Sequence, residues 1–361
     1  MASPHDARRW RLLLVLLALL GLTAAACGDD DDAGAAGEDR SESQSDEPVT
    51  LRLGYFPNIT HAPALVGDYG GLFEEAVGAD VAIETTTFNA GPEAIEALAA
   101  DALDVSFLGP NPAINAFARD HDLLRIVAGS TSGGAFLVVK DGIDAPGDLA
   151  GTTLATPQLG NTQDVALRAW LQDQGYETDE SGGGDVAIQP QANAEALAAF
   201  LAGDLDGAWV PEPWATRFVQ EGGAHVLVDE ADLWPDGEYV TTHLVVRTAF
   251  LDEHPDVVRG LIEGLAAAVD LIDTDAAQAK ALTNQGIEEI SGKALGQAVL
   301  DAAWENLHFT LDPIASSLQT SAEDAEAAGL LDPVDLTGIY DLALLNEVLA
   351  ARGEPAVEAL G

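Results

Sequence analysis

The fold of this chain is decided by Val49-Thr-Leu-Arg-Leu-Gly-Tyr55 and by the turn that follows it, Phe56-Pro-Asn-Ile-Thr-His61. The first segment alternates apolar and polar residues, which is typical of a half-buried β-strand. The second is a polar, proline-containing turn, and the segment from Ala62 to Phe73 then has the apolar spacing of a helix. A strand that leads through a polar turn into a helix is the repeating unit of α/β folds.

The same order of strand, turn and helix recurs along the chain. A first set has strands at 81–87, 104–108, 124–128 and 135–139, with helices at 93–100 and from 112 onward. A second set has strands at 152–155, 186–189, 207–210, 226–228 and 239–246, helices at 163–174 and 194–201, and a helical tail at 257–272, 294–306 and 340–351. The pattern predicts an α/β protein of two lobes, each a mainly parallel sheet flanked by helices. Lobe one is expected at 50–132 plus 242–361, and lobe two at 133–241.

The N-terminal segment indicates export. Arg8, Arg9 and Arg11 precede an apolar run at 12–22 and four small residues, and Cys27 follows. This order is that of a secretory signal at 1–26, and a signal that ends directly on cysteine resembles the bacterial lipoprotein signal. We expect Cys27 to carry lipid, residues 27–49 to be a lipid-anchored disordered tether, and the protein to lie on the extracytoplasmic face of the cell membrane. General and twin-arginine export both stay open.

The charge of the chain excludes some functions. It carries 15 basic and 61 acidic residues, a formal net charge of −46. This excludes the basic surface that nucleic-acid binding needs. Cys27 is the only cysteine, so neither a disulfide framework nor a cysteine-based metal site is possible, and the seven histidines show no metal-binding spacing. The protein is expected to act as a monomer without a metal or cofactor.

Polar turns at strand ends are the candidate binding site. Ligands of open α/β sheets bind beyond the carboxyl ends of strands, where helix N-termini present free N–H groups. Gly91 and Asn111 are expected to be helix N-caps, and Ser130-Thr-Ser-Gly-Gly134 is expected to be a hinge between lobes. The predicted ligand-binding residues are Asn58, His61, Asn89, Gly91, Asn111, Ser130, Thr131, Ser132, Gln158, Asn161 and Thr162, with Trp209 and Trp214 against the organic part of a ligand.

Catalytic signatures are missing from the sequence. Gly129-Ser-Thr-Ser-Gly133 has threonine where a Gly-x-Ser-x-Gly nucleophile would be, and the phosphate-binding glycine motifs are absent. The sequence therefore favours a binding protein over an enzyme, and no catalytic residue is predicted.

From about residue 50 onward the chain resembles the substrate-binding proteins of nitrate/sulfonate/taurine-type ABC importers. The resemblance rests on the order and spacing of short motifs, which are Leu53-Gly-Tyr-Phe-Pro-Asn58, Gly70-Gly-Leu-Phe73, Ala100-Asp-Ala-Leu-Asp-Val105, Asp148-Leu-Ala-Gly-Thr152 and Trp209-Val-Pro-Glu-Pro-Trp214.

This resemblance implies the type II periplasmic-binding-protein fold, with a ligand cleft between two lobes. It also implies capture of a small oxyanion, most simply an aliphatic sulfonate, for an ABC permease in the cytoplasmic membrane. Nitrate, bicarbonate or a thiamine-pyrimidine precursor are alternative ligands, and ligand sensing is an alternative role. The enzyme of the wider group depends on a cysteine-rich motif that this chain lacks.

Overall fold

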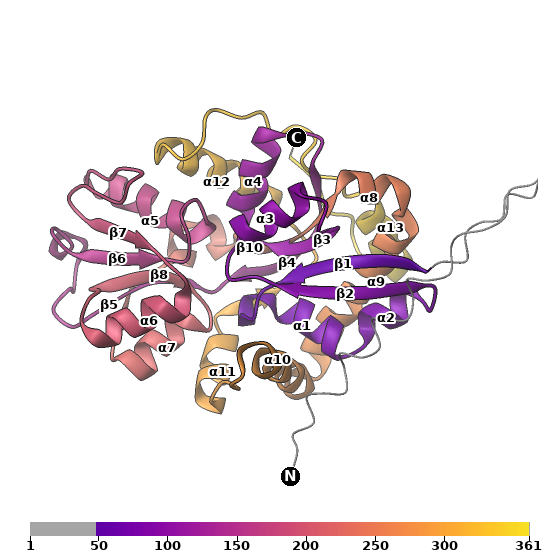
Figure 1. The fold of residues 1–361 in the computed structure, drawn as a ribbon, viewed down its shortest axis with the longest axis horizontal. Helices are drawn as coiled ribbons and strands as arrows, with labels where there is room; N and C mark the ends of the chain where they lie inside the picture. The colour runs from indigo at the N-terminus through magenta and orange to yellow at the C-terminus, as the bar shows by residue number, and fades with distance from the viewer. Residues whose placement is uncertain (1–47, 361) are drawn as a thin grey trace, which may run out of the picture. The chain divides into compact units, whose positions relative to one another are not determined.

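The computed structural model describes residues 48–360, and their strands form two separate sheets (Figure 1). The first sheet has six strands in the order β11-β4-β10-β3-β1-β2. Their bounds are β1 Val49–Tyr55, β2 Val81–Thr87, β3 Val105–Leu108, β4 Leu124–Gly133, β10 Val240–Arg247 and β11 Leu307–Phe309. This sheet therefore combines strands from the beginning and from the later part of the chain.

The second sheet is built only from the middle of the chain. Its order is β7-β6-β8-β5-β9. The bounds are β5 Ala135–Val139, β6 Thr153–Thr156, β7 Ala187–Pro190, β8 Gly207–Pro211 and β9 His225–Asp229. All described residues belong to one compact unit, in which each sheet with its helices forms one lobe. The predicted α/β class is confirmed.

Both sheets are mixed, which corrects the expectation of mainly parallel sheets. β1 runs parallel to β2 and β3, but β10 is antiparallel to β3 and β4, and β11 is antiparallel to β4. In the second sheet β6 is parallel to β7 and β8, whereas β5 is antiparallel to β8 and β9. β5 follows β4 directly and β10 follows two 3₁₀ turns. A parallel strand needs a long crossover connection, usually a helix. No α-helix directly precedes β5 or β10, so these strands can run antiparallel.

Helices cover both faces of each sheet (Figure 1). Successive side chains of a strand point to opposite faces, so Phe107 packs in the core that contains α9, whereas Leu108 packs in the core that contains α4. The helices are α1 Ala62–Tyr69, α2 Leu72–Val77, α3 Gly91–Ala99, α4 Pro110–Arg119, α5 Thr162–Asp173, α6 Asn193–Ala202, α7 Trp214–Gly222, α8 Thr248–Glu253, α9 Pro255–Thr274, α10 Ala276–Ser291, α11 Gln297–Trp304, α12 Ala315–Ala327 and α13 Ala343–Arg352. Short 3₁₀ turns are η2 Ile59–His61, η3 Pro146–Asp148, η4 Glu230–Leu233 and η5 Pro235–Gly237.

The chain passes from the first sheet to the second at two glycines. β4 ends at Gly133 (φ +80°), and Gly134 (φ +74°) precedes β5. The positive φ of Gly134 favours glycine, and a Cβ there would also force the Leu307 side chain to move, because it would lie 2.2 Å from Leu307 Cδ2. The expected hinge loop at 130–134 is shorter in the structure, because residues 130–132 are part of β4 and Thr131 and Ser132 pair with both β10 and β11.

No helix between residues 48 and 360 is long and apolar enough to span a lipid bilayer. The predicted signal at 1–26, the lipid site Cys27 and all but the last two residues of the predicted tether lie outside the described residues.

Candidate functional site

A small cavity lies where the loops of the two sheets meet. Its volume is about 20 Å³, far below the 300–1,000 Å³ typical of small-molecule pockets. Its walls come from segments just beyond the carboxyl ends of six strands, β1, β2, β3, β6, β7 and β8, and from the start of β10. The lining residues are Phe56, Asn58, Thr60, His61, Asn89, Ala90, Gly109, Pro157, Asn161, Thr162, Gln163, Asn193, Pro211, Thr241 and Thr242.

Four helices begin at this cavity. Ala90, Gly109 and Asn161 are the N-cap residues of α3, α4 and α5, and Asn193 is the first residue of α6. The first N–H groups of a helix have no partner within the helix and carry partial positive charge. In these four helices no N-cap side chain accepts from a backbone N–H of its own helix. The N-termini of four helices therefore lie at the cavity, and the positive ends of helix dipoles favour anions. Pro92, Pro110 and Pro112 in the first turns of α3 and α4 have no N–H, so fewer donors are available there than at α5 and α6.

Gly91 and Asn111 were expected from the sequence to be N-caps, but they are not, because their helices begin earlier. α3 begins at Gly91 and α4 at Pro110, so both residues lie inside the first turn of their helices. Pro110 takes the first helical position because proline has no N–H to leave unpaired there. Asn161 is an N-cap, but its amide accepts from the Gly91 N–H and donates to Gln163 Oε1 rather than binding a backbone N–H of α5.

The cavity lining contains no lysine or arginine among residues 48–360. Its one imidazole, His61, is buried, and burial lowers its pKa to about 3, so the ring is neutral at physiological pH. The N–H of Phe56 donates to His61 Nδ1 at 3.4 Å, which leaves the ring hydrogen on Nε2. The site can therefore act as an uncharged hydrogen-bond donor and acceptor surface.

Two buried polar atoms in the lining lack partners. Thr162 Oγ1 and Asn193 Oδ1 make no hydrogen bond with any described residue, although both side chains are more than nine-tenths buried. Polar groups in protein interiors are nearly always hydrogen-bonded. Of the two, the Thr162 hydroxyl can donate a hydrogen bond to an anion, whereas Asn193 Oδ1 can only accept one.

Contacts between the lobes close the cavity. Trp214 Nε1 of lobe two donates to Asn58 Oδ1 of lobe one at 2.9 Å. The N–H of Gly91 donates to Asn161 Oδ1 at 3.4 Å. The structure thus brings these four predicted residues together, with His61, Asn89 and Thr162 in the lining beside them.

Other predicted residues lie away from the lining. Asn111 Nδ2 donates to the Ser321 carbonyl at 2.9 Å, and Gln158 is next to the lining residue Pro157. Ser130, Thr131 and Ser132 belong to β4, where Ser132 Oγ accepts from the Tyr239 N–H.

The two tryptophans have different surroundings. Trp209 is fully buried inside β8 and donates to Glu230 Oε2 at 2.7 Å, so it is a core residue. Trp214 begins α7 at the lobe boundary, and the guanidinium of Arg217 stacks over its ring at 4.6 Å. Trp214 is not in the lining of the small cavity itself, but it contacts the lining residue Asn58 through its Nε1.

Glu212 supports the turn between them. Its carboxylate accepts from the Thr216 N–H and Oγ1 and from Asn306 Nδ2 of lobe one, at 3.1, 2.8 and 2.7 Å. Burial raises its pKa, and these donors partly offset that effect. Arg217, three residues after Trp214, donates to Glu221 and not to Glu212.

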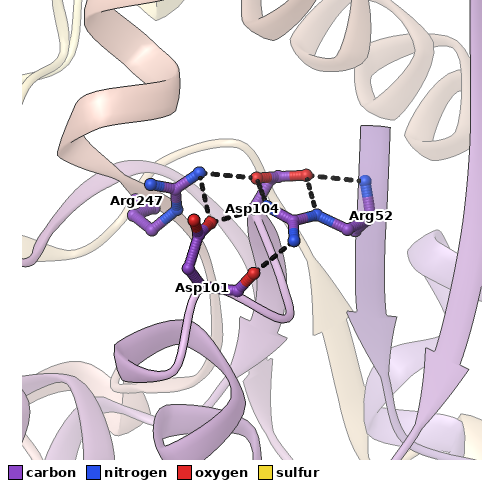
Figure 2. A network of polar contacts seen from close by, with 4 residues as sticks. All are labelled: Arg52, Asp101, Asp104 and Arg247. Carbon is purple, nitrogen blue, oxygen red and sulfur yellow. Dashed lines mark hydrogen bonds and ion pairs between the residues drawn. The ribbon is translucent and has the colours of Figure 1, made fainter. Parts of the chain in front are cut away.

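Arg247 binds acidic side chains away from the cavity. It pairs with Asp104 at 2.9 Å, and Arg52 binds the same carboxylate through Nε at 2.7 Å (Figure 2). Burial alone would raise the pKa of Asp104, but the hydrogen bonds from the two arginines more than offset it and lower that pKa. The network joins the start of β3 to the end of β10, at the strand ends on the side of the sheet opposite the cavity.

A buried ion pair lies in α5, the helix that begins after the lining residue Asn161. Asp164, in the first turn of α5, accepts from Arg168 Nε at 3.1 Å, from Thr156 Oγ1 at 2.8 Å and from the Gly160 N–H at 3.0 Å. Both charged side chains are fully buried. The pair fixes the loop that leads into Asn161. Sequence reasoning missed it, although an aspartate four residues before an arginine on a helix was a usable signal.

The sequence also did not single out Thr60, Gln163, Asn193, Thr241 and Thr242, which line the cavity. Asn193 could have been found as a polar residue at the start of the helix after β7. The described residues contain no cluster of three or more histidine, cysteine or acidic side chains arranged for a metal ion.

Comparison with known proteins agrees with this geometry. A model of the NMT1-like family matches residues 44–285. The chain belongs to this family. Among similar proteins, the taurine-binding periplasmic protein of Escherichia coli K12 is 30% identical over 198 residues, which is 55% of this chain and 59% of that protein. A putative aliphatic sulfonates-binding protein of Bacillus subtilis is 29% identical over 252 residues, 68% of this chain and 69% of that protein.

Solved structures show the fold of this NMT1-like protein. The alkanesulfonate-binding protein SsuA of Xanthomonas axonopodis pv. citri, bound to MOPS, has a TM-score of 0.70 at 22% identity and covers 82% of this chain and 99% of its own. The nitrate-binding protein NrtA of Synechocystis PCC 6803 has a TM-score of 0.72 at 15% identity, with 87% and 93% covered. They confirm the predicted two-lobed periplasmic-binding-protein fold, and the relatives are substrate-binding proteins of transport systems.

Proposed function

We propose that this protein is the extracytoplasmic substrate-binding component of an ABC importer and that its substrate is an aliphatic sulfonate. The observation that carries the proposal is the cavity at the N-termini of α3, α4, α5 and α6, whose lining includes a buried donor without a partner, the Thr162 hydroxyl. A sulfonate offers three oxygens, and each hydrogen bond to a charged group contributes about 1.5–3 kcal/mol. The names of the taurine- and sulfonate-binding relatives point to the same ligand class.

Neutral donors suit a chain of this charge. With a net charge of −46 the long-range field repels anions, but salt screens that field beyond about 8–10 Å. Inside the cavity the nearby N–H dipoles determine the interaction. Lobe closure would exclude water and strengthen these hydrogen bonds.

In this proposal the protein is a monomer that delivers its ligand to a membrane permease and catalyses no reaction. Lipid on Cys27 holds it at the outer face of the cytoplasmic membrane. The predicted ligand contacts are Asn58, His61, Asn89, Asn161 and Thr162, with Asn193 and Gln163 added from the structure.

Nitrate is the second candidate ligand. The observation that favours it is the small volume of the cavity, about 20 Å³, which suits a compact anion without an organic part.

The test compares two glutamines at the two ends of α5. Gln163 lines the cavity and is buried, whereas Gln174, the C-cap residue directly after this helix, is exposed. Gln163→Glu places a negative charge beside the anion, and Gln174→Glu makes the same charge change in solvent. Isothermal titration with taurine, ethanesulfonate, nitrate, bicarbonate and a pyrimidine identifies the ligand in the unchanged protein.

We expect ethanesulfonate or taurine to bind, Gln163→Glu to weaken that binding at least a hundredfold, and Gln174→Glu to leave it unchanged. Selective binding of nitrate would replace sulfonate with the second candidate. A bound pyrimidine that tolerates Gln163→Glu would overturn the anion-binding proposal altogether.

A further inference from the structure

A second, larger cavity lies at the lobe boundary, next to the small one. Its volume is about 240 Å³. Side chains of α3, α4 and the segment after α12 line it from lobe one, and the β6–α5 loop and the loop after α5 line it from lobe two. The apolar part of its lining consists of Pro92, Ile95, Pro112, Ala116, Leu159 and Leu330. Figure 1 shows α4 and α12 facing α5 here, where these helices are in contact.

Only a thin wall separates the two cavities. Ala90 and Asn161 line the small cavity, and their near neighbours in sequence, Pro92 and Gly160, line the large one. Between them lies Gly91, where a Cβ would be 2.3 Å from Pro112 Cγ and 3.4 Å from Asn161 Oδ1. The wall is therefore a glycine backbone, a proline ring and an amide.

One side of the wall is a contact between lobes, because Gly91 and Pro112 belong to lobe one and Asn161 belongs to lobe two. The Gly91 N–H and Asn161 Oδ1 are 3.4 Å apart, at the outer limit of a hydrogen bond. A small separation of the lobes at this point would join the two cavities. A ligand whose charged end lies in the small cavity could then extend into the large one.

The large cavity has an exposed apolar residue at its lining. Leu159 is 41% exposed and is one of four large apolar side chains exposed in the described chain. Covering a solvent-exposed apolar side chain with an apolar ligand removes its surface from water, which makes binding more favourable. Arg119, Glu96 and Glu180 also line this cavity, and Arg119 forms no ion pair with any described carboxylate, so a polar chain end is accommodated.

We propose that the large cavity binds the hydrocarbon chain of the ligand, so that the substrate is a sulfonate with a chain longer than the two carbons of taurine. This inference rests on the proposed function, since it takes the small cavity as the site of the sulfonate group. It adds a substrate class and a residue, Leu159, that sets chain-length preference.

The test is isothermal titration of the full chain with ethane-, butane- and hexanesulfonate. Each fully buried methylene strengthens binding about fourfold, so hexanesulfonate is expected to bind at least tenfold more tightly than ethanesulfonate. Leu159→Ala should remove most of this preference and leave ethanesulfonate binding unchanged. Leu201→Ala is the matched control, because Leu201 is an exposed leucine of the same lobe, on α6, that lines neither cavity.

The outcomes separate the two proposals. If ethanesulfonate binds and chain length brings no gain, or if Leu159→Ala keeps the gain, the chain site is wrong and the sulfonate proposal stands. If no member of the series binds, the proposed function fails and this inference fails with it.

Discussion

Replacing Glu230 with glutamine should make the protein more stable at neutral and alkaline pH. Glu230 is 1% exposed, and its Oε2 accepts from Trp209 Nε1 at 2.7 Å. Burial raises its pKa from 4.5 to about 7, the indole hydrogen bond partly offsets this, and the nearby carboxylates of Asp324 and Asp229 add to it. The folded protein therefore holds this proton more tightly than the unfolded chain does.

The sign and size of the effect follow from this difference. Below pH 4.5 the carboxyl is protonated in both states. As the pH rises from 4.5 to about 7, the unfolded chain ionises while the folded protein does not, so stability falls. At about 1.36 kcal/mol per pKa unit, the loss reaches about 3 kcal/mol above pH 7. Glu230→Gln keeps an acceptor for Trp209 and has no proton to lose.

Urea unfolding followed by tryptophan fluorescence measures the effect. We expect the variant to exceed the wild type by about 3 kcal/mol at pH 8 and to match it near pH 4.5. Glu238→Gln, an exposed glutamate of the same segment, should change neither value. Burial also raises the pKa of Asp324, to about 6, so some pH dependence stays in the variant. Equal differences between variant and wild type at both pH values would refute the reasoning.

Three further predictions concern the site and the anchor. Asn161→Ala should weaken sulfonate binding about ten- to a hundredfold by titration calorimetry, since it removes the acceptor of the contact between lobes, and wild-type affinity would contradict the assigned role. Thr162→Val should weaken binding similarly while the free energy of unfolding without ligand stays equal or rises, because Oγ1 is buried without a partner; a clear loss of stability would show that the hydroxyl has a structural role. Cys27→Ser should move the protein from the membrane fraction to the soluble fraction, and unchanged fractionation would exclude the lipid anchor.

The sequence predicted elements and turns better than strand direction. The alternation of 49–55 and the polar turn after it were sufficient to place β1 and the start of α1, although the helix expected at 62–73 is divided at Gly70-Gly71 into α1 and α2. Strand direction depends on how the chain re-enters a sheet, and local periodicity carries no such information. Residues 130–132 show the same limit, because hydroxyls beside two glycines resemble a loop, whereas tertiary pairing with β10 and β11 makes them a strand.

Site residues were predicted correctly where they directly follow a strand in the sequence. Asn58, Asn89 and Asn161 each follow a strand, and strand ends converge in this fold, so all three reach the cavity. Trp209 and Trp214 are five residues apart in one motif, and only the end of β8 between them separates a core side chain from one at the lobe boundary. Asn193 directly precedes the helix expected at 194–201 and could have been noticed there, but its place at the cavity depends on the order of β6, β7 and β8 in the sheet.

The helix N-termini at the cavity belong to the main chain, which has an evolutionary consequence. A point substitution changes a side chain and, unless it introduces proline, leaves the N–H group in place. Attraction for an anionic group is then inherited with the backbone and resists mutational drift. Selectivity among anions depends on replaceable side chains such as those of Thr162, Asn193 and Leu159. Descendants of this protein could therefore change substrate by single substitutions without first losing affinity for anions.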